Sequence, residues 1–102
     1  MKYNIYAGLG GGFGGSEYIL TEEFNTKDEA LKYARDEAIE IYKSYEGFHG
    51  IRSYNEIVEE YEEEYDETLS EVDANLLYWE EVEGWITYHV EEYDPNNPPE
   101  DE

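Results

Sequence analysis

Residues 53 to 83 read SYNEIVEEYEEEYDETLSEVDANLLYWEEVE. They include thirteen carboxylates but neither lysine nor arginine, and Arg52, directly before them, is the last basic residue of the chain. Tyrosines and aliphatic residues nevertheless recur through the stretch at helical spacing. An acidic run is usually disordered, whereas one with an apolar stripe can fold as a helix that holds its charge outward. The stretch therefore predicts amphipathic helices, and its unmixed charge points to a partner of opposite sign.

Three helices are predicted from capping signals that precede apolar residues at spacings of three and four. Thr26 precedes a helix over residues 27–45, Ser53 precedes one over residues 54–67, and Ser70 caps a third that continues through about residue 83. We expect the second and third helices to bury one apolar stripe each. These stripes comprise Tyr54, Ile57, Val58, Tyr61 and Tyr65 in the second helix, and Val72, Leu76, Trp79 and Val82 in the third.

Three segments have strand character, because their residues alternate in polarity or are rich in β-branched and aromatic types. They span residues 2–7, 16–24 and 85–90. In the second segment we expect Tyr18 and Leu20 to share one face. The third segment, Trp85 to Val90, also continues the preceding helical pattern, so it fits both a helix and a strand. We favour the strand, because a two-stranded hairpin alone is marginal.

Residues 8–15 contain six glycines, which excludes a helix and predicts a hairpin connection that can also extend the two strands. We expect Leu9 and Phe13 to be exposed there, as apolar residues that could enter a partner's pocket. The run also matches G-x-G-x-x-G from Gly10 onward. A dinucleotide fingerprint needs a helix after its glycines. A strand follows here, so we predict no cofactor.

These elements predict an α+β fold with a three-stranded antiparallel sheet and about three helices packed on one face, in the order β-β-α-α-α-β. The first strand is central if the last one pairs with it. At 102 residues the chain forms one domain, which we place at residues 1–93. Residues 94–102 contain all three prolines of the chain and predict a disordered acidic tail.

The charge balance limits the classes of partner. The chain has 28 acidic and 6 basic residues, a formal net charge of −22 and twelve tyrosines. Nucleic acid and anionic membranes would be repelled, so we expect direct contact with neither. A basic protein is the natural partner. The chain has no cysteine and begins without a signal peptide, so we expect it in the cytoplasm.

Catalytic and metal-binding interpretations find little support in the residues. The four serines are explained as turn and cap residues, and neither His49 nor His89 has a recognisable catalytic partner. The carboxylates lack the glycine of a calcium-binding loop, and no helix carries the Glu-x-x-His pattern of a di-iron bundle. We therefore predict neither an enzyme nor a metal site.

The charge density of residues 54–67 suggests a more specific interpretation. A helix of this length is about 21 Å long and carries a carboxylate roughly every 2.6 Å. Duplex DNA carries one phosphate charge about every 1.7 Å. A net charge of magnitude about 2 to 8 is enough to keep a small domain in solution, so solubility does not explain the excess. Like charges four residues apart also destabilise a helix.

The chain resembles the small acidic DNA-mimic inhibitors encoded by phages. The resemblance lies in its size, its charge pattern, its high aromatic content and its lack of cysteine, and in the acidic residues 54–67. Such inhibitors include anti-restriction proteins, anti-CRISPR proteins and uracil-DNA glycosylase inhibitors. The resemblance implies a host nuclease, repair enzyme or CRISPR effector as the target, without choosing among them. It covers composition and charge pattern, and it carries over no individual functional residue.

Two hypotheses follow. In the first, the protein is a nucleic-acid-mimic inhibitor that binds the basic cleft of a DNA-processing or host defence protein. In the second, it is an acidic interaction module, an adaptor or structural subunit, without mimicry. The oligomeric state is open, with a homodimer as one alternative. The partner-binding residues that we predict are Glu56, Glu59, Glu60, Glu63, Glu64, Asp66, Glu67 and Phe13.

Overall fold

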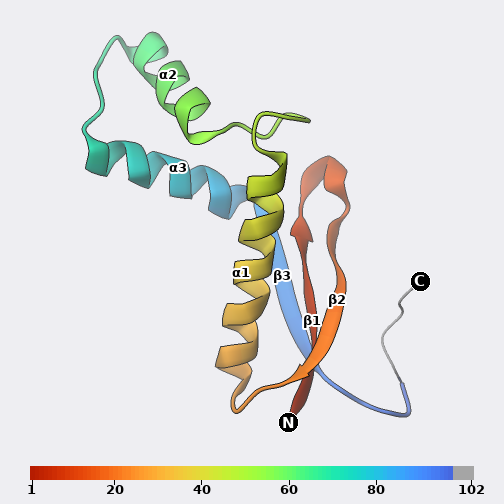
Figure 1. Ribbon diagram of the computed structural model, residues 1–102. Coiled ribbons are helices and arrows are strands. Elements are labelled where there is room, and N and C mark those ends of the chain that lie inside the picture. Colours follow the sequence, from red (N-terminus) through yellow and green to blue (C-terminus); the bar gives the residue numbers. More distant parts are fainter. Residues whose placement is uncertain (98–102) are drawn as a thin grey trace.

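Figure 1 shows the computed structural model of the protein, which describes residues 1–97. The mixed α+β fold is confirmed, with a three-stranded antiparallel sheet, three helices and the order β-β-α-α-α-β. A short 3₁₀ turn, η1, lies between the first two strands. The elements are β1 (Lys2–Leu9), η1 (Gly11–Phe13), β2 (Gly15–Glu23), α1 (Lys27–Tyr45), α2 (Tyr54–Tyr65), α3 (Glu71–Trp85) and β3 (Ile86–Glu92).

The first strand is the central one, because β1 pairs antiparallel with both β2 and β3. The segment that fitted both a helix and a strand divides at Trp85, where α3 ends, and is strand from Ile86 onward. No loop separates the two elements. Ile86 is already extended, while its N–H still donates to the Val82 carbonyl of the last helical turn. This direct joint ties the rotation of α3 to the sheet.

A bulge in β2 changes which side chains share a face. Ile5 lies opposite Leu20, but Tyr6 lies opposite Tyr18, so Ile19 is an extra residue in the ladder. Residues directly opposite each other point to the same side of a sheet. Leu20 therefore packs with the cluster of Ile5, whereas Tyr18 lies with Tyr6 on the other side. The prediction that Tyr18 and Leu20 share a face was wrong.

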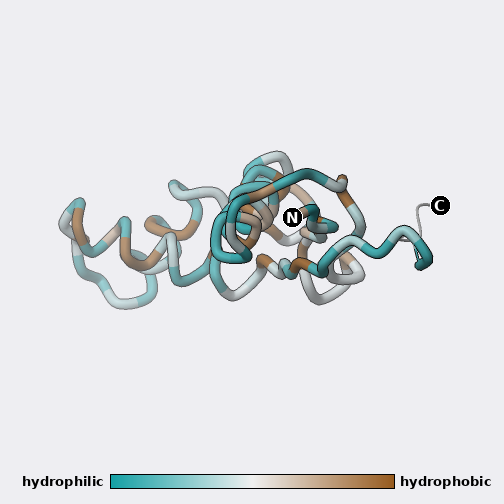
Figure 2. Tube along the Cα trace, turned by 90° about the horizontal axis from the view of Figure 1, so that it is seen from below, coloured by the Kyte–Doolittle hydropathy of each residue, from teal (hydrophilic) through white to brown (hydrophobic). Residues whose placement is uncertain are grey.

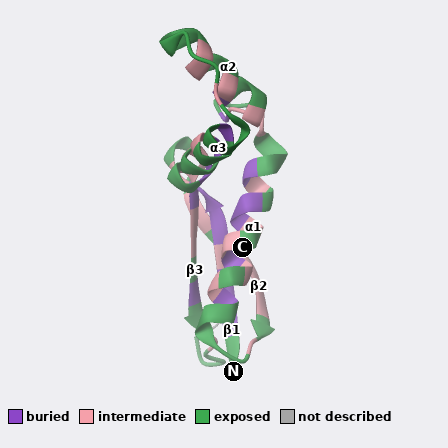
Figure 3. Cartoon of the chain, turned by 90° about the vertical axis from the view of Figure 1, so that its left-hand side faces the viewer, coloured by how far each residue is buried: buried purple, intermediate pink, exposed green. Residues whose placement is uncertain are grey.

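One face of the sheet is covered by α1, as Figure 3 shows by the buried residues between them. Ala30, Ala34 and Ala38 repeat every four residues and are fully buried. Such small side chains let the helix backbone approach the strands closely. Ile39 and Tyr42 continue the same buried side toward the end of the helix. The N-terminus of α1 is capped as predicted, since the Thr26 side chain accepts a hydrogen bond from the Glu29 amide.

The glycine run is partly strand and partly turn. Gly8 pairs with Ser16 and Leu9 pairs with Gly15, so both strands extend into the run. Only residues 10–14 form the connection. Leu9 is 1% exposed because β1 continues through it and directs it into the core. The expectation that Leu9 is exposed was therefore wrong.

Replacing Gly8 by alanine should destabilise the fold by about 2 kcal/mol or more, because overpacking forces the backbone to shift. A Cβ at this position would lie 2.2 Å from the Gly15 carbonyl oxygen. Gly12→Ala is the matched control, because a Cβ there meets nothing within 4 Å. It should change stability by less than about 0.5 kcal/mol. Urea denaturation of both variants checks this, and similar midpoints would contradict it.

The other two helices form an acidic arm, residues 54–85, that projects from the body made by the sheet and α1 (Figures 1 and 2). The radius of gyration is 16.6 Å and the principal extents are 57 × 27 × 15 Å. A compact domain of about 100 residues has a radius of gyration of about 13 Å. Of the three helices, α1 lies along the sheet, whereas α2 packs against α3 beyond the end of the sheet. Apolar residues of the arm therefore have few neighbours to pack against.

The predicted stripe of α3 is rotated away from the core. Val72, Leu76 and Trp79 are 68%, 60% and 38% exposed. Tyr78 and Val82, on a neighbouring stripe, pack into the core, where the Tyr78 ring meets that of Tyr42 in α1. The buried residues of α3 are instead Ala74, Tyr78 and Val82. Of the predicted stripe, only Val82 is buried.

The predicted stripe of α2 is buried only at its start. Ile57 is buried, and Tyr65 at the end of the helix is 56% exposed. Burial decreases along α2 because the helix moves away from the body and has only α3 beside it. The half-buried members of the stripe are Tyr54, Val58 and Tyr61.

Two buried tyrosines form the joint between the body and the arm. Tyr42 is fully buried, and its hydroxyl donates to the Arg52 carbonyl over 3.0 Å. Its ring meets that of Tyr78 edge-on at 6.2 Å between centroids. The Tyr78 hydroxyl donates to the Glu46 carboxylate. Burial, and then this hydrogen bond, raise the pKa of Tyr78 above its ordinary value.

The stability of the protein should fall between about pH 10 and pH 12. Burial, and then the charges of Glu81 and Glu46, raise the pKa of Tyr42 to about 12. A tyrosine in an unfolded chain has a pKa of about 10. The folded state therefore disfavours tyrosinate, so the contribution of Tyr42 is complete below pH 10 and is lost as the pH rises toward 12.

Tyr42→Phe tests this assignment. Loss of the hydrogen bond to the Arg52 carbonyl should lower the free energy of unfolding by about 1 kcal/mol at neutral pH. The variant should also lose less stability than the parent between pH 10 and pH 12, because it lacks one titrating group. Tyr65→Phe, at an exposed position, should leave the alkaline decline unchanged. Denaturation curves across this pH range measure both, and a parallel decline for Tyr42→Phe would refute the assignment.

The chain after β3 starts with a turn. The Tyr93 amide donates to the Lys2 carbonyl, which continues the pairing of β3 with β1. Within residues 94–97, the Asn97 amide donates to the Asp94 carbonyl, and the Asn96 amide donates to the Asp94 side chain. The rest of the predicted tail, residues 98–102, lies outside the described residues.

Candidate partner-binding site on the acidic arm

The start of α2 uses one of the predicted carboxylates for its own structure. The Glu56 side chain accepts a hydrogen bond from the Ser53 amide at 2.9 Å. In return, the Glu56 amide donates to the Ser53 hydroxyl at 3.3 Å. This capping box satisfies two amides that the helix leaves without internal partners. Glu56 is exposed as predicted, but its carboxylate is already engaged.

A second predicted carboxylate is bound by Arg52. The guanidinium lies 2.5 Å from Glu60 of α2 and 2.7 Å from Glu81 of α3. The hydrogen bonds to Glu81, and then to Glu60, raise the pKa of Arg52 above its ordinary value. One cation thus links the two helices at the base of the arm. Glu60 contributes to the assembly of the arm rather than to its free charge.

The turn between α2 and α3 is also organised by a carboxylate. Asp66 ends α2 in the left-handed conformation, with φ of 55°. The Glu62 carboxylate then accepts a hydrogen bond from the Leu69 amide at 2.9 Å. Ser70 begins α3 by accepting a bond from the Asp73 amide. These local bonds give the far end of the arm a defined shape despite its charge.

The remaining predicted carboxylates differ from Glu56 and Glu60. They are exposed and have no hydrogen bond or ion pair to another side chain within residues 1–97. They are Glu59, Glu63, Glu64, Asp66 and Glu67, of which the last two lie beyond the end of α2. The structure adds three exposed carboxylates of α3 that share these properties. Those are Glu71, Asp73 and Glu80. The three belong to the same acidic stretch of sequence as the predicted residues, so the sequence could have indicated them.

Apolar side chains lie among these charges. A hollow of about 260 Å³ lies between the end of α2 and the outer side of α3. Its apolar walls include Leu69 and Leu76, and carboxylates such as Glu67 and Glu80 surround them. With Val72 and Trp79, Leu76 forms an exposed apolar stripe one helical face wide. The arm therefore offers charge and an apolar contact together.

Phe13 does not join the carboxylates. It lies in the glycine-rich turn of the body, half-buried, with its ring 5.1 Å from that of Tyr45 and 5.9 Å from that of Trp85. The expectation of an exposed Phe13 was wrong, because the turn folds toward the end of α1. Sequence reasoning missed this aromatic neighbourhood, since its members come from distant parts of the chain.

Comparisons with known proteins give no assignment: no family model, no curated protein and no solved structure matches the chain. Among the described residues, no three carboxylate or imidazole groups converge as ligands of one metal ion would. Within residues 1–97, no helix combines the length and the apolarity that a membrane span requires. The arm thus combines exposed carboxylates with an exposed apolar stripe.

Arg52→Met should destabilise the protein by about 1–2 kcal/mol, because it removes both ion pairs and leaves Glu60 and Glu81 facing each other. The loss should be larger at low ionic strength, where repulsion between carboxylates is less screened. Lys32→Met is the control. Its pair with Asp36 is highly exposed, and its loss should change stability by less than about 0.5 kcal/mol. Urea denaturation at two salt concentrations measures both, and equal effects would contradict a bridging role for Arg52.

Proposed function

We propose that the protein is a nucleic-acid-mimic inhibitor whose acidic arm occupies the basic nucleic-acid-binding cleft of a host defence or DNA-processing protein in the cytoplasm. A CRISPR effector, a restriction enzyme and a repair enzyme are the candidate classes of target. The observation that carries the proposal is the set of exposed, unpaired carboxylates on an arm that projects from the body. A projecting element can enter a cleft that the whole domain could not.

The physical basis is the same as for a phosphate backbone. Lysine and arginine side chains of the target would pair with Glu59, Glu63 and Glu64 of α2 and with the carboxylates at the end of the arm. Counterions released from both surfaces would contribute much of the binding free energy, so affinity would fall steeply with salt. Long-range attraction would also speed association. The capping box and the Arg52 bridge support this function because they hold the charges in fixed positions.

The apolar stripe would add what charge alone does not provide. Val72, Leu76 and Trp79 are spaced on one side of α3, and a large aromatic residue is a frequent anchor of protein interfaces. A second copy of the chain is an unfavourable occupant, because it would bring another net charge of −22 toward the first. A cleft with basic rims and an apolar floor fits both properties.

The same stripe favours a second candidate function. Nucleic acid presents no apolar helix face, so a binding mode dominated by Leu76 and Trp79 need not imitate it. In that case the protein is an acidic interaction module, an adaptor or structural subunit, and it binds a basic partner outside the nucleic-acid site. Competition with nucleic acid separates the two functions.

A neutralised arm should bind the target about 10- to 100-fold more weakly, because three ion pairs are lost. The variant carries Glu59→Gln, Glu63→Gln and Glu64→Gln, and keeps Glu56 and Glu60 for the structure of the arm. A control with Glu22→Gln, Glu40→Gln and Glu92→Gln makes the same change of charge at exposed sites of the body. The control should retain most of the affinity and of its salt dependence.

The target for these measurements is recovered on immobilised protein from a bacterial lysate at low salt and identified by mass spectrometry. Affinities of parent and variants are then measured at several salt concentrations, with and without duplex DNA. Mutual exclusion between DNA and the protein supports mimicry. A ternary complex with DNA would overturn it in favour of the interaction module, and equal weakening by both variants would remove the arm as the site.

A further inference from the structure

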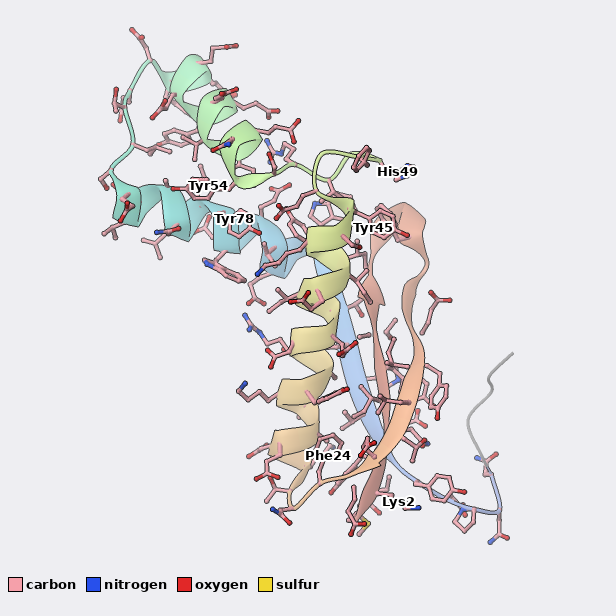
Figure 4. All side chains as sticks on the ribbon, in the orientation of Figure 1. Lys2, Phe24, Tyr45, His49, Tyr54 and Tyr78 are labelled. Carbon is pink, nitrogen blue, oxygen red and sulfur yellow. The ribbon has the colours of Figure 1, made fainter. Side chains whose placement is uncertain are left out.

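Four aromatic rings meet at the end of the body, outside the acidic arm's carboxylate surface. Phe13 comes from the turn between β1 and β2, Tyr45 ends α1, His49 lies in the following connection, and Trp85 ends α3. With Gly12 they line an open pocket of about 410 Å³. Figure 4 shows Tyr45 and His49 beside the tip of the hairpin. Segments far apart in the sequence therefore form one site.

The rings surround the pocket rather than stack. Phe13 and Trp85 meet at an interplanar angle of 82°, with 5.9 Å between centroids. Tyr45 and His49 meet at 71° and 5.7 Å, and Phe13 lies at 54° to Tyr45. Rings packed only to fill a core would bury their surfaces, whereas Tyr45 is 36% exposed and His49 is also exposed. Because the rings meet at steep angles, several of their surfaces face the pocket.

The backbone fixes this arrangement. The Gly10 amide donates to the Trp85 carbonyl at 2.8 Å, which joins the glycine-rich turn to the end of α3. Gly11 has a φ of 61°, and a Cβ there would lie 3.3 Å from the Trp85 ring. His49 also has a positive φ, of 54°, which is unusual for a residue other than glycine. Such local strain is often found where side chains are held for binding.

Two carboxylates lie next to the pocket, and one of them, Glu81, is also paired with Arg52. The Trp85 indole N–H donates to the Glu81 carboxylate at 3.2 Å, and Glu17 lines a smaller cavity beside Phe13 and Tyr45. The net charge of −22 attracts cations toward the whole surface and repels anions. The faces of aromatic rings are also electron-rich and attract cations within about 6 Å of their centroids. Both properties select the same class of ligand.

We propose that this aromatic pocket binds an organic cation of the alkylated ammonium class. Trp85, Tyr45 and Phe13 supply the ring surfaces, and the neighbouring Glu17 and the negative charge of the protein supply the attraction. The ammonium group can belong to a free quaternary ammonium compound or to a methylated lysine side chain of a protein. The pocket does not use the unpaired carboxylates of the arm, so this inference stands independently of the mimic function.

The test compares choline with its neutral isostere 3,3-dimethylbutan-1-ol, which has the same shape without the charge. Each is titrated into ¹⁵N-labelled protein at constant ionic strength, and chemical shifts are followed. Choline should shift the amides of Gly12, Phe13 and His49 and the Trp85 indole N–H, and the isostere should not. Equal binding of the two would overturn the proposal by showing a merely apolar pocket, and no binding of choline would also overturn it.

Variants assign the binding to the rings. Tyr45→Leu should weaken choline binding by about 3- to 30-fold, because it keeps an apolar side chain but removes one aromatic face. Phe13→Leu provides a second variant if the first alters the amide spectrum of the fold. Phe48→Leu is the matched control, since Phe48 lies in the same connection, is 64% exposed and does not line the pocket. Equal weakening by the control would refute the assignment.

Two further measurements distinguish the source of the cation and keep the two proposals separate. A short peptide with trimethyl-lysine that binds more tightly than choline identifies a protein side chain, and tighter binding of choline identifies a free compound. The variant with Glu59→Gln, Glu63→Gln and Glu64→Gln should bind choline within about twofold of the parent, because these residues do not line the pocket. Loss of choline binding in that variant would show that the overall charge of the protein, and not the pocket, attracts choline. That result would overturn the proposal.

Discussion

The bridge from Arg52 to Glu60 and Glu81 is the interaction on which the rest of the structure depends. Two helices that carry one sign of charge would repel each other, and no later residue of the chain can neutralise them. Arg52 stands where α1 has ended and α2 is about to begin, so one guanidinium reaches both helices of the arm. Its own carbonyl accepts the bond from Tyr42 in the body. One residue thus links body, α2 and α3.

Both arginines of the chain pair with carboxylates at the base of the arm. Arg35 of α1 pairs with Glu83 of α3, and this bond is the main cause that raises the pKa of Arg35. With Arg52 it neutralises carboxylates close to the body. Lys32 pairs only with its own helix neighbour Asp36. The far end of the arm receives no cation from within residues 1–97, so the charge is concentrated at the end that projects.

Sequence patterns predicted the elements well because their signals are local. The side chains of Thr26, Ser53 and Ser70 each cap the helix that was predicted to follow. The order of strands followed from β-branched and aromatic residues after α3 and from the marginal stability of a two-stranded hairpin. The rotation of α3 could not be predicted, because two stripes, one with Trp79 and one with Tyr78, have equal helical spacing. The contacts of Tyr78 with Tyr42 and Tyr54, which lie far away in the sequence, accompany the observed rotation.

In the candidate site, too, features with local signals could be predicted, whereas features that depend on distant contacts could not. Exposure of the seven predicted partner-binding carboxylates followed from the high free energy of burying an unpaired charge. Which of them are free did not, since the pairing of Glu60 depends on the path of Arg52 into the arm. The capping box at Ser53 already assigned the Glu56 carboxylate to the backbone, and that signal was in the sequence. The surroundings of Phe13 depend on contacts between residues more than 30 positions apart, which no local pattern records.

The elongated shape makes a net charge of −22 compatible with folding. Electrostatic interactions are screened over about 8 Å at physiological ionic strength, and the molecule is 57 Å long. Charges at the end of the arm therefore act little on the body, whereas a compact sphere would hold all of them within a few screening lengths. Thirteen of the 28 carboxylates lie in the arm, and because the arm projects from the body, most of these thirteen are exposed.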